Sequence, residues 1–226
     1  LYSFCQQQDC TDGQNLEAAP IDVKGTLYGT TAFGGIGGGL GGGGGGVMFS
    51  LDPATGTEKS LYVFCSLANC QDGANPRGSL IDVNGTLYGV TSGGGDTGCG
   101  GYGCGTVFSI DPNTGAEKVI YSFCSQQNCA DGATPFAGLI VVKGVLYGTT
   151  QNGGRTGCGN YGCGTVFSID PNTGAEKVLY SFCSLTNCAD GATPSANLIT
   201  VKGMLYGTTS GGGSYAEGTV FALTKR

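Results

Sequence analysis

The string GCGTVFSIDPNTGAEKVIYSFC runs from Gly103 to Cys124 and returns at Gly162 to Cys183 with one change, Ile120 becoming Leu179. The chain is therefore made of repeats, and the fold of one repeat predicts the fold of the others. Two further copies diverge more: Val47 to Phe64 and, truncated, Gly218 to Arg226.

Two runs rich in β-branched and aromatic residues lie within this string, and a turn sequence joins them. Gly105 to Ile110 and Glu117 to Phe123 have the composition of strands, and Asp-Pro-Asn-Thr-Gly stands between them at 111–115. Proline presets φ at the second turn position, aspartate accepts from its own backbone, and glycine takes the left-handed position. The string therefore predicts a β-hairpin.

Each repeat contains two more short runs of strand character, such as Leu80 to Val83 and Thr86 to Thr91, joined by the tight turn Asn84-Gly85. No stretch shows helical periodicity. Four strands in a unit of this length are typical of a propeller blade, because solenoid coils have shorter periods. The motif that sets the period begins at Leu1, Leu61, Ile120 and Leu179, a spacing of 60, 59 and 59 residues.

We therefore predict an all-β fold, a four-bladed β-propeller with four antiparallel strands per blade. It is expected to form a single domain over residues 1–226, with repeats at about 1–60, 61–119, 120–178 and 179–226. The last repeat stops before its fourth strand, whereas the chain begins with a spare copy, Leu1-Tyr2-Ser3-Phe4. We expect this N-terminal strand to complete the last blade, either within the chain or in a neighbouring copy.

The composition excludes several classes of function. Lys and Arg number 10 against 16 Asp and Glu, and the net charge of -6 argues against a nucleic-acid partner. No run of 18 apolar residues and no signal-peptide pattern is present, so we expect no membrane span. There is no histidine, and no nucleophile and base stand out, so the chain is expected to be neither an enzyme nor dependent on a cofactor.

All twelve cysteines fall in C-x4-C pairs. One type of pair is missing as a whole from the first and last repeats, and cysteines that come and go together are most simply bonded together. Metal ligation is the weaker alternative, since histidine is absent and zinc sites usually have C-x2-C spacing. We predict six local disulfides and hence an extracytoplasmic protein. The pairs are Cys5/Cys10, Cys65/Cys70, Cys99/Cys104, Cys124/Cys129, Cys158/Cys163 and Cys183/Cys188.

The alternation of strand direction predicts two unlike faces, one with tight turns and one with long loops. The long-loop face would carry every C-x4-C loop, the glycine-rich segments and three tyrosines, Tyr102, Tyr161 and Tyr215. These tyrosines are the candidate ligand-binding residues, as stacking platforms for sugars. The first glycine-rich segment, Gly34 to Gly46, is nearly all glycine.

Several single residues have a structural and a functional interpretation. Asn84 begins an N-glycosylation sequon, but Asn-Gly is also a favoured hairpin turn. The aspartates that precede glycine after each cysteine loop could bind calcium, although a capped turn is the better interpretation because each stands alone. Glycines at the centre of the second strand are expected to let neighbouring blades approach. The aspartates considered for calcium are Asp72, Asp131 and Asp190, and the glycines are Gly29, Gly89, Gly148 and Gly207.

The pattern G-x-L-Y-G-T-T, then a glycine-rich segment, then G-T-V-F-S-I-D-P-x-T-G, resembles the GloVer-type tandem repeat of bacterial surface proteins. The resemblance covers essentially the whole chain. It implies an exported, surface-associated protein and offers no catalytic residues. The dense cysteine pairs depart from the family pattern, and we expect a further departure in the C-terminal anchor, which this chain would lack. The matching segments are Gly25 to Thr31, Gly85 to Thr91, Gly144 to Thr150 and Gly203 to Thr209.

Two functions remain ahead of catalysis. The first is a structural protein of the cell surface or extracellular matrix that self-associates, as a fibre subunit formed by head-to-tail stacking of propellers. The alternative is a lectin-like module that binds glycans through the glycine- and tyrosine-rich loop face. Near-identical repeats favour the structural protein, because they supply rigidity and self-complementarity and not one unique pocket.

Overall fold

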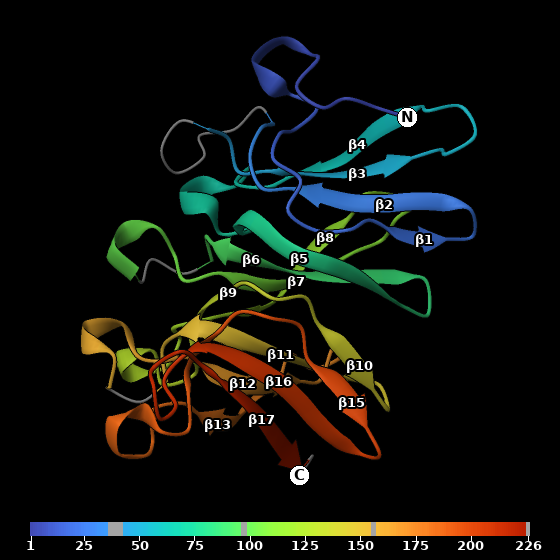
Figure 1. Cartoon of the computed structure of the whole chain (residues 1–226). Coiled ribbons are helices and arrows are strands. Elements are labelled where there is room, and N and C mark those ends of the chain that lie inside the picture. Colours follow the sequence, from blue (N-terminus) through green and yellow to red (C-terminus); the bar gives the residue numbers. More distant parts are fainter. Residues whose placement is uncertain (36–42, 96–98, 155–156, 225–226) are drawn as a thin grey trace. The chain divides into compact units, whose positions relative to one another are not determined.

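The structure, a computed structural model, describes residues 1–35, 43–95, 99–154 and 157–224. It contains two compact units, Leu1–Ser122 and Phe123–Arg226. Each unit holds two antiparallel sheets (Figure 1). Each unit is described by itself below, and the single domain over residues 1–226 stays a prediction. Most of the run from Gly34 to Gly46 lies outside the described residues.

The first unit contains sheet 1 and sheet 2, each a four-stranded meander in chain order. Neighbouring strands pair antiparallel throughout, as the repeat pattern predicts. Sheet 1 comprises β1 (Ile21–Val23), β2 (Thr26–Thr31), β3 (Val47–Leu51) and β4 (Glu58–Val63). Sheet 2 comprises β5 (Ala74–Val83), β6 (Thr86–Gly93), β7 (Thr106–Ile110) and β8 (Glu117–Ser122).

The second unit contains sheets 3 and 4, whose first strand is broken into two short pieces that pair with the same neighbour. Sheet 4 has no strand beyond β17 among the described residues, so it lacks the fourth strand of the repeat. Sheet 3 comprises β9 (Ala133–Pro135), β10 (Ile140–Val142), β11 (Val145–Asn152), β12 (Thr165–Ile169) and β13 (Glu176–Ser181). Sheet 4 comprises β14 (Ala192–Pro194), β15 (Ile199–Val201), β16 (Met204–Gly211) and β17 (Thr219–Thr224).

Helical structure in the described residues is limited to three-residue 3₁₀ turns. None of them is long or apolar enough to span a bilayer. All six turns lie in the connections between strands, at Gln8–Cys10, Ala68–Cys70, Cys99–Gly101, Gln127–Cys129, Gly159–Tyr161 and Thr186–Cys188.

The hairpin predicted from the repeated string is confirmed. In the second repeat the carboxylate of Asp111 accepts from the backbone N–H of Asn113 at 2.8 Å, and Gly115 has a φ of 73°. The backbone N–H of Gly115 donates to the carbonyl of Asp111 at 2.8 Å and closes the turn. Glycine is required at this position because side chains disfavour positive φ.

The core of each unit is built from one aromatic pair per sheet. The phenylalanine that follows each fourth strand packs on the central phenylalanine of the next third strand, as in Phe64 with Phe108, whose ring centroids are 4.9 Å apart. Phe182 and Phe221 repeat this contact at 4.9 Å in the second unit. The third strand is buried on both faces in sheets 1 to 3, as expected for strands packed between sheets.

The central glycine of each second strand has a different role from the one predicted. A Cβ atom on Gly148 would lie 2.5 Å from Cζ of Phe167, its cross-strand partner, and 2.9 Å from Cδ2 of Leu139. Gly89 meets Phe108 at 2.5 Å in the same way. These glycines therefore make room for the phenylalanine ring of their own sheet, and the expectation that they admit a neighbouring blade is wrong.

The N-terminal run Leu1 to Phe4 does not form a strand in this structure, and no sheet includes it. It nevertheless lies against sheet 1 as the end of β4 lies against sheet 2. The Phe4 and Phe49 rings are 4.7 Å apart, and the carbonyl of Leu1 lies at the turn glycine Gly56. The completion of the last blade by this run stays a prediction.

Candidate functional site

Each of the twelve cysteines is bonded to its C-x4-C partner, as predicted. Four of the loops follow a fourth strand, or the N-terminal run that resembles one, and end in a 3₁₀ turn whose middle residue has positive φ. The remaining two lie between the second and third strands of sheets 2 and 3. Within each unit the covalent loops thus lie in the segments that connect the strands or precede the first strand.

An aspartate holds each loop that follows a fourth strand. Asp72 is fully buried and its carboxylate accepts from the hydroxyl of Tyr62 at 2.9 Å, the backbone N–H and hydroxyl of Ser66 at 2.9 and 2.8 Å, and the N–H of Leu67 at 3.2 Å. It does not cap the Asp-Gly turn in which it lies. It holds the preceding cysteine loop from the inside, so the expectation that it caps its own turn is wrong.

The same network recurs in the second unit around Asp190. Burial alone would raise the pKa of Asp190, but hydrogen bonds from the Tyr180 hydroxyl and from the backbone of Ser184 and Leu185 outweigh burial and lower the pKa to about 2. The carboxylate is therefore ionised at neutral pH and occupied by donors. Sequence reasoning missed the tyrosine, although its distance from the aspartate is ten residues in each repeat.

The glycine-rich loops are held by backbone hydrogen bonds. The N–H of Gly153 donates to the carbonyl of Tyr161 at 2.6 Å, and the N–H of Gly154 donates to the carbonyl of Cys129 at 2.8 Å. The second bond ties the glycine-rich loop to the cysteine loop of the same repeat. Tyr161 thus holds the loop through its backbone carbonyl, while its side chain lies at the surface.

The three candidate ligand-binding tyrosines are all exposed, with Tyr102 at 61%, Tyr161 at 77% and Tyr215 at 89% of their full surface. Exposed rings of this size are available for stacking on the apolar face of a sugar. The structure brings none of them into a described pocket, and they stand on separate loops. Their role as binding residues stays a prediction.

Asn84 lies in the tight turn between β5 and β6, with a φ of 55° and an exposed side chain. The backbone N–H of Gly85 donates to Asp82 at 2.7 Å, which fixes this turn. The equivalent turn residues Lys143 and Lys202 also have positive φ, so the turn alone accounts for the conformation of Asn84. Its glycosylation stays a prediction.

Glu117 is a half-buried glutamate that lies near the buried aspartate Asp72 in the first unit. Burial, followed by repulsion from Asp72, raises the pKa of Glu117 to about 7. The Oε1 atom of Glu117 is buried without a hydrogen-bond partner. This site can therefore bind a proton near neutral pH, which affects stability whether or not it has a further role.

We expect the chain to lose stability as the pH rises from 5 to 8. The folded-state pKa of Glu117 is about 7, above its ordinary value of 4.5, so folded protein binds a proton that unfolded protein has released. This stabilisation is complete below the unfolded value and is lost as the pH rises through the folded value. Thermal unfolding at several pH values should show it, and Glu117→Gln should flatten the profile. An unchanged profile in this variant would assign the effect to another group.

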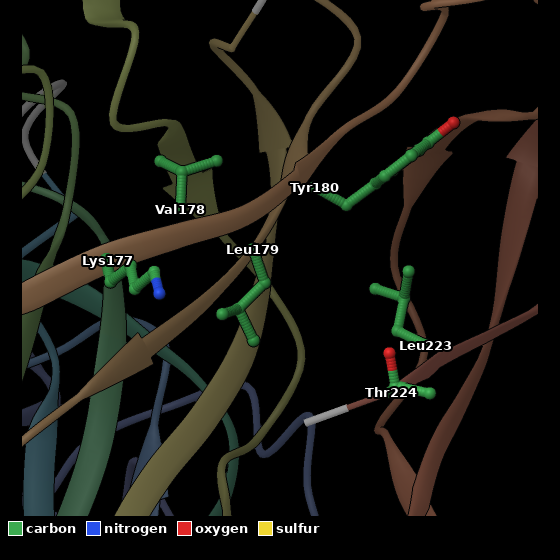
Figure 2. A pocket seen from close by; sticks show the side chains of 6 residues that line it. All are labelled: Lys177, Val178, Leu179, Tyr180, Leu223 and Thr224. Atoms are coloured by element: carbon green, nitrogen blue, oxygen red, sulfur yellow. The ribbon is translucent and has the colours of Figure 1, made fainter. Parts of the chain in front are cut away.

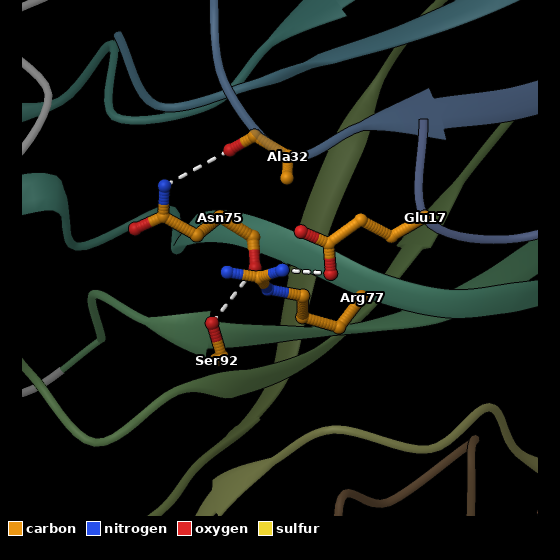
Figure 3. Close-up of polar contacts among 5 residues, drawn as sticks. All are labelled: Glu17, Ala32, Asn75, Arg77 and Ser92. Atoms are coloured by element: carbon orange, nitrogen blue, oxygen red, sulfur yellow. Dashed lines mark hydrogen bonds and ion pairs between the residues drawn. The ribbon is translucent and has the colours of Figure 1, made fainter. Parts of the chain in front are cut away.

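Neighbouring repeats meet through residues at the same repeat position. Glu17 in the first repeat and Arg77 in the second are 60 residues apart and form an ion pair (Figure 3). In the second unit the N–H of Gly138 donates to the side chain of Asn197, 59 residues further on, at 2.7 Å. Figure 3 also shows Asn75 bridging to the carbonyl of Ala32, at 2.9 Å. No motif in the sequence marks these residues.

An open groove of about 410 Å³ lies between β13 and β17 in the second unit. Figure 2 shows the side chains that line it, which come from these two strands. β17 is paired on one edge only among the described residues, and Val220 on this strand is 80% exposed. Its counterparts Met48 and Val107 are fully buried. The groove residues are Lys177, Val178, Leu179, Tyr180, Leu223 and Thr224.

The comparison with protein families identifies the repeat. The model of the Gloeobacter/Verrucomicrobia repeat matches residues 1–221. The chain belongs to this repeat family. The expected resemblance to GloVer-type repeats is thereby confirmed. No curated protein has a significant sequence match to this member of the Gloeobacter/Verrucomicrobia repeat family.

Solved structures share the fold of this Gloeobacter/Verrucomicrobia repeat chain at low sequence identity. One is the nidogen/laminin complex, with a TM-score of 0.51, 11% identity, and coverage of 89% of this chain and 60% of that chain. Another is the extracellular domain of a protein described as a hybrid two-component system from B. thetaiotaomicron. Its TM-score is 0.54 at 12% identity, and the match covers 94% of this chain and 21% of that chain. The chain spans less than two thirds of either protein, and the likeness shows the fold alone.

Proposed function

We propose that the chain is a non-catalytic structural protein of the cell surface or extracellular matrix, built as a four-bladed β-propeller and able to self-associate. The observation that carries the proposal is sheet 4, which has no fourth strand among the described residues, while a copy of the missing strand sequence stands outside any sheet at Leu1 to Phe4. Leu-Tyr-Ser-Phe at the N-terminus is identical to Leu179 to Phe182, whose first three residues form the end of β13.

Contacts between equivalent residues support the propeller arrangement. Glu17 meets Arg77 in the first unit, and Gly138 meets Asn197 in the second. Residues at one position of successive blades converge near the axis of a propeller. The two pairs occupy different positions of the repeat, but each joins equivalent residues of successive repeats within one unit, as a propeller arrangement would require.

The position of the N-terminal run against sheet 1 supports its role as the missing strand. Its contacts with sheet 1, through Phe4 and Leu1, match those of the end of β4 with sheet 2. A fourth strand such as β4 makes two contacts: it pairs with the third strand of its own sheet, and its end packs on the next sheet. The N-terminal run makes only the second contact, and pairing with β17 would supply the first. Pairing with β17 would remove an exposed sheet edge. The pairing can occur within one chain, which effective concentration favours, or between copies.

The disulfides support an extracellular location, because such bonds persist in oxidising compartments. Six of them occur in 226 residues. Stacking of the long-loop face of one propeller on the tight-turn face of the next would give a head-to-tail contact that does not close and therefore grows a fibre.

We expect Val220→Lys to destabilise the folded chain or to prevent its assembly, although Val220 is 80% exposed in this structure. A charge on this strand would be buried by the incoming N-terminal run, and burial of an unpaired charge is costly. Thermal unfolding and light scattering after size-exclusion chromatography measure the two effects. The matched control is Leu185→Lys, at a residue that is 57% exposed in a cysteine loop.

The two routes of completion give different results in this experiment. A lower melting temperature of the monomer indicates closure within the chain, and stable monomers that no longer assemble indicate donation between copies. Deleting Leu1 to Cys10 should reproduce whichever result is found. If Val220→Lys behaves as Leu185→Lys does in both measurements, the edge of β17 is not covered and the proposal is wrong.

A lectin-like module is the second candidate, favoured by the exposed tyrosines of the glycine-rich loops. Saturable binding on a glycan array that is lost in Tyr102→Ala and Tyr161→Ala would support it. Binding that survives both substitutions would remove these loops from consideration.

A further inference from the structure

Two disulfide loops of the second unit come together so that four cysteine sulfurs share one site. The Sγ atoms of Cys158, Cys163, Cys183 and Cys188 all lie within 4.8 Å of one another. The first pair belongs to the loop between β11 and β12, and the second to the loop after β13. Residues far apart in the sequence thus supply a cluster of one ligand type.

The backbone holds this cluster independently of the disulfides. The N–H of Phe182 donates to the carbonyl of Gly164 at 3.0 Å, and the N–H of Thr193 donates to the carbonyl of Cys163 at 2.8 Å. These two bonds join the loops on either side of the sulfurs. Phe182 is also fully buried, which anchors the second loop in the core.

Gly157 lies close to the sulfurs of both disulfides. A Cβ atom on Gly157 would lie 2.9 Å from Sγ of Cys183 and 3.2 Å from Sγ of Cys163. The absence of a side chain at this position therefore lets the backbone approach sulfurs of both pairs. Cys163 is fully buried, and the other three are partly buried.

We propose that, when both disulfides are reduced, these four cysteines form a tetrathiolate site for a thiophilic divalent cation such as Zn²⁺. Tetrahedral coordination with Zn–S bonds of about 2.3 Å places the sulfurs about 3.8 Å apart, which requires small movements from the present arrangement. C-x4-C spacing lies within the range that zinc sites use. The protein would then exchange a covalent crosslink for a metal crosslink between the same two loops.

The redox step needs an external reductant of the dithiol class. Each protein disulfide takes two electrons and two protons from one dithiol, which is itself oxidised to a disulfide, so two dithiols yield four protein thiols. Binding of the cation by four thiolates releases four protons to solvent. The site is therefore available before oxidation of the exported chain, or under reducing conditions, and is absent in the oxidised form.

The first unit contains a natural control in the loop of Cys65 and Cys70. Here the residue approaching the loop is Gly45, whose added Cβ would lie 2.5 Å from the Cβ of Cys65. The chain has no cysteine between Cys10 and Cys65. Reduction of this loop exposes two sulfurs, which is too few for a tetrathiolate site.

Cobalt titration of the full chain tests the proposal. The protein is reduced with a phosphine, the reductant is removed under anaerobic conditions, and the reduced protein is titrated with Co²⁺. Tetrahedral thiolate complexes of Co²⁺ have characteristic visible and charge-transfer absorption bands. Cys158→Ser with Cys163→Ser should bind one Co²⁺ fewer than the wild type. Cys65→Ser with Cys70→Ser should bind as much as the wild type. Zn²⁺ should displace Co²⁺ and raise the melting temperature of the reduced protein, and should leave that of the oxidised protein unchanged.

Equal Co²⁺ binding by the Cys158/Cys163 variant and the wild type would overturn the proposal. So would an equal loss in the Cys65/Cys70 variant, because this would indicate unspecific binding to thiols. If reduction unfolds the chain, circular dichroism after addition of Zn²⁺ decides the matter. Refolding of the wild type and not of the Cys158/Cys163 variant supports the site, and failure of both to refold contradicts it.

Discussion

Replacing Asp72 with alanine is expected to lower the free energy of unfolding by about 3–5 kcal/mol, because a fully buried carboxylate with four charge-assisted hydrogen bonds is lost. The carboxylate accepts four hydrogen bonds from three residues and is fully buried. Hydrogen bonds to charged groups contribute roughly 1.5–3 kcal/mol each, and water that reaches the exposed residues Ser66 and Leu67 reduces the sum. Urea denaturation of the oxidised protein measures the loss.

Asp111→Ala is the matched control for this substitution. Asp111 also accepts from backbone and side-chain N–H groups, but it does so in an exposed turn where water can replace it. Its removal should cause a much smaller change. The acceptor role assigned to Asp72 is wrong if the two variants lose the same stability.

Gly148→Ala is expected to destabilise the chain by roughly 3 kcal/mol, because overpacking a filled core displaces side chains or backbone. The new Cβ would lie 2.5 Å from the Phe167 ring. Phe167 is fully buried and its ring packs on that of Phe123 at a centroid distance of 5.0 Å, so it has little room to move. Adding Phe167→Leu to the variant should recover part of the loss.

The fourth repeat supplies the control for this second substitution. Gly207 faces Phe221 with the same geometry, 2.4 Å from the added Cβ to Cζ, but Phe221 lies on the half-covered strand β17 and is only partly buried. Gly207→Ala should therefore cost less than Gly148→Ala. Equal losses at the two sites would show that the backbone, and not the phenylalanine ring, sets the energy.

The sequence allowed the hairpins and the cysteine pairs to be predicted because their signals are local. Asp111 to Gly115 contains every residue that the turn needs, and the joint absence of cysteine pairs from some repeats identified the partners. Both features depend on residues only a few positions apart, and the repetition of the chain provided several copies of the evidence.

The networks that depend on folding over longer distances were missed. Tyr62 and Asp72 are ten residues apart, and the Asp-Gly pair is itself a sufficient turn signal, so the sequence does not indicate the hydroxyl donor. The role of Gly148 was assigned to the wrong neighbour, since sequence alone does not show which ring faces it. The four-sulfur cluster joins loops whose proximity depends on the pairing of β11, β12 and β13.

The contact between Glu17 and Arg77 bears on how such a chain can grow by duplication of its gene. Because Glu17 and Arg77 occupy equivalent positions of adjacent repeats and touch, a faithful copy of one of these repeats would place the residue at this position beside its own duplicate. A second repeat copied unchanged would set arginine against arginine, and like charges in contact are unfavourable. New copies must therefore diverge first at this position, where the chain already has glutamate, arginine, phenylalanine and serine at Glu17, Arg77, Phe136 and Ser195.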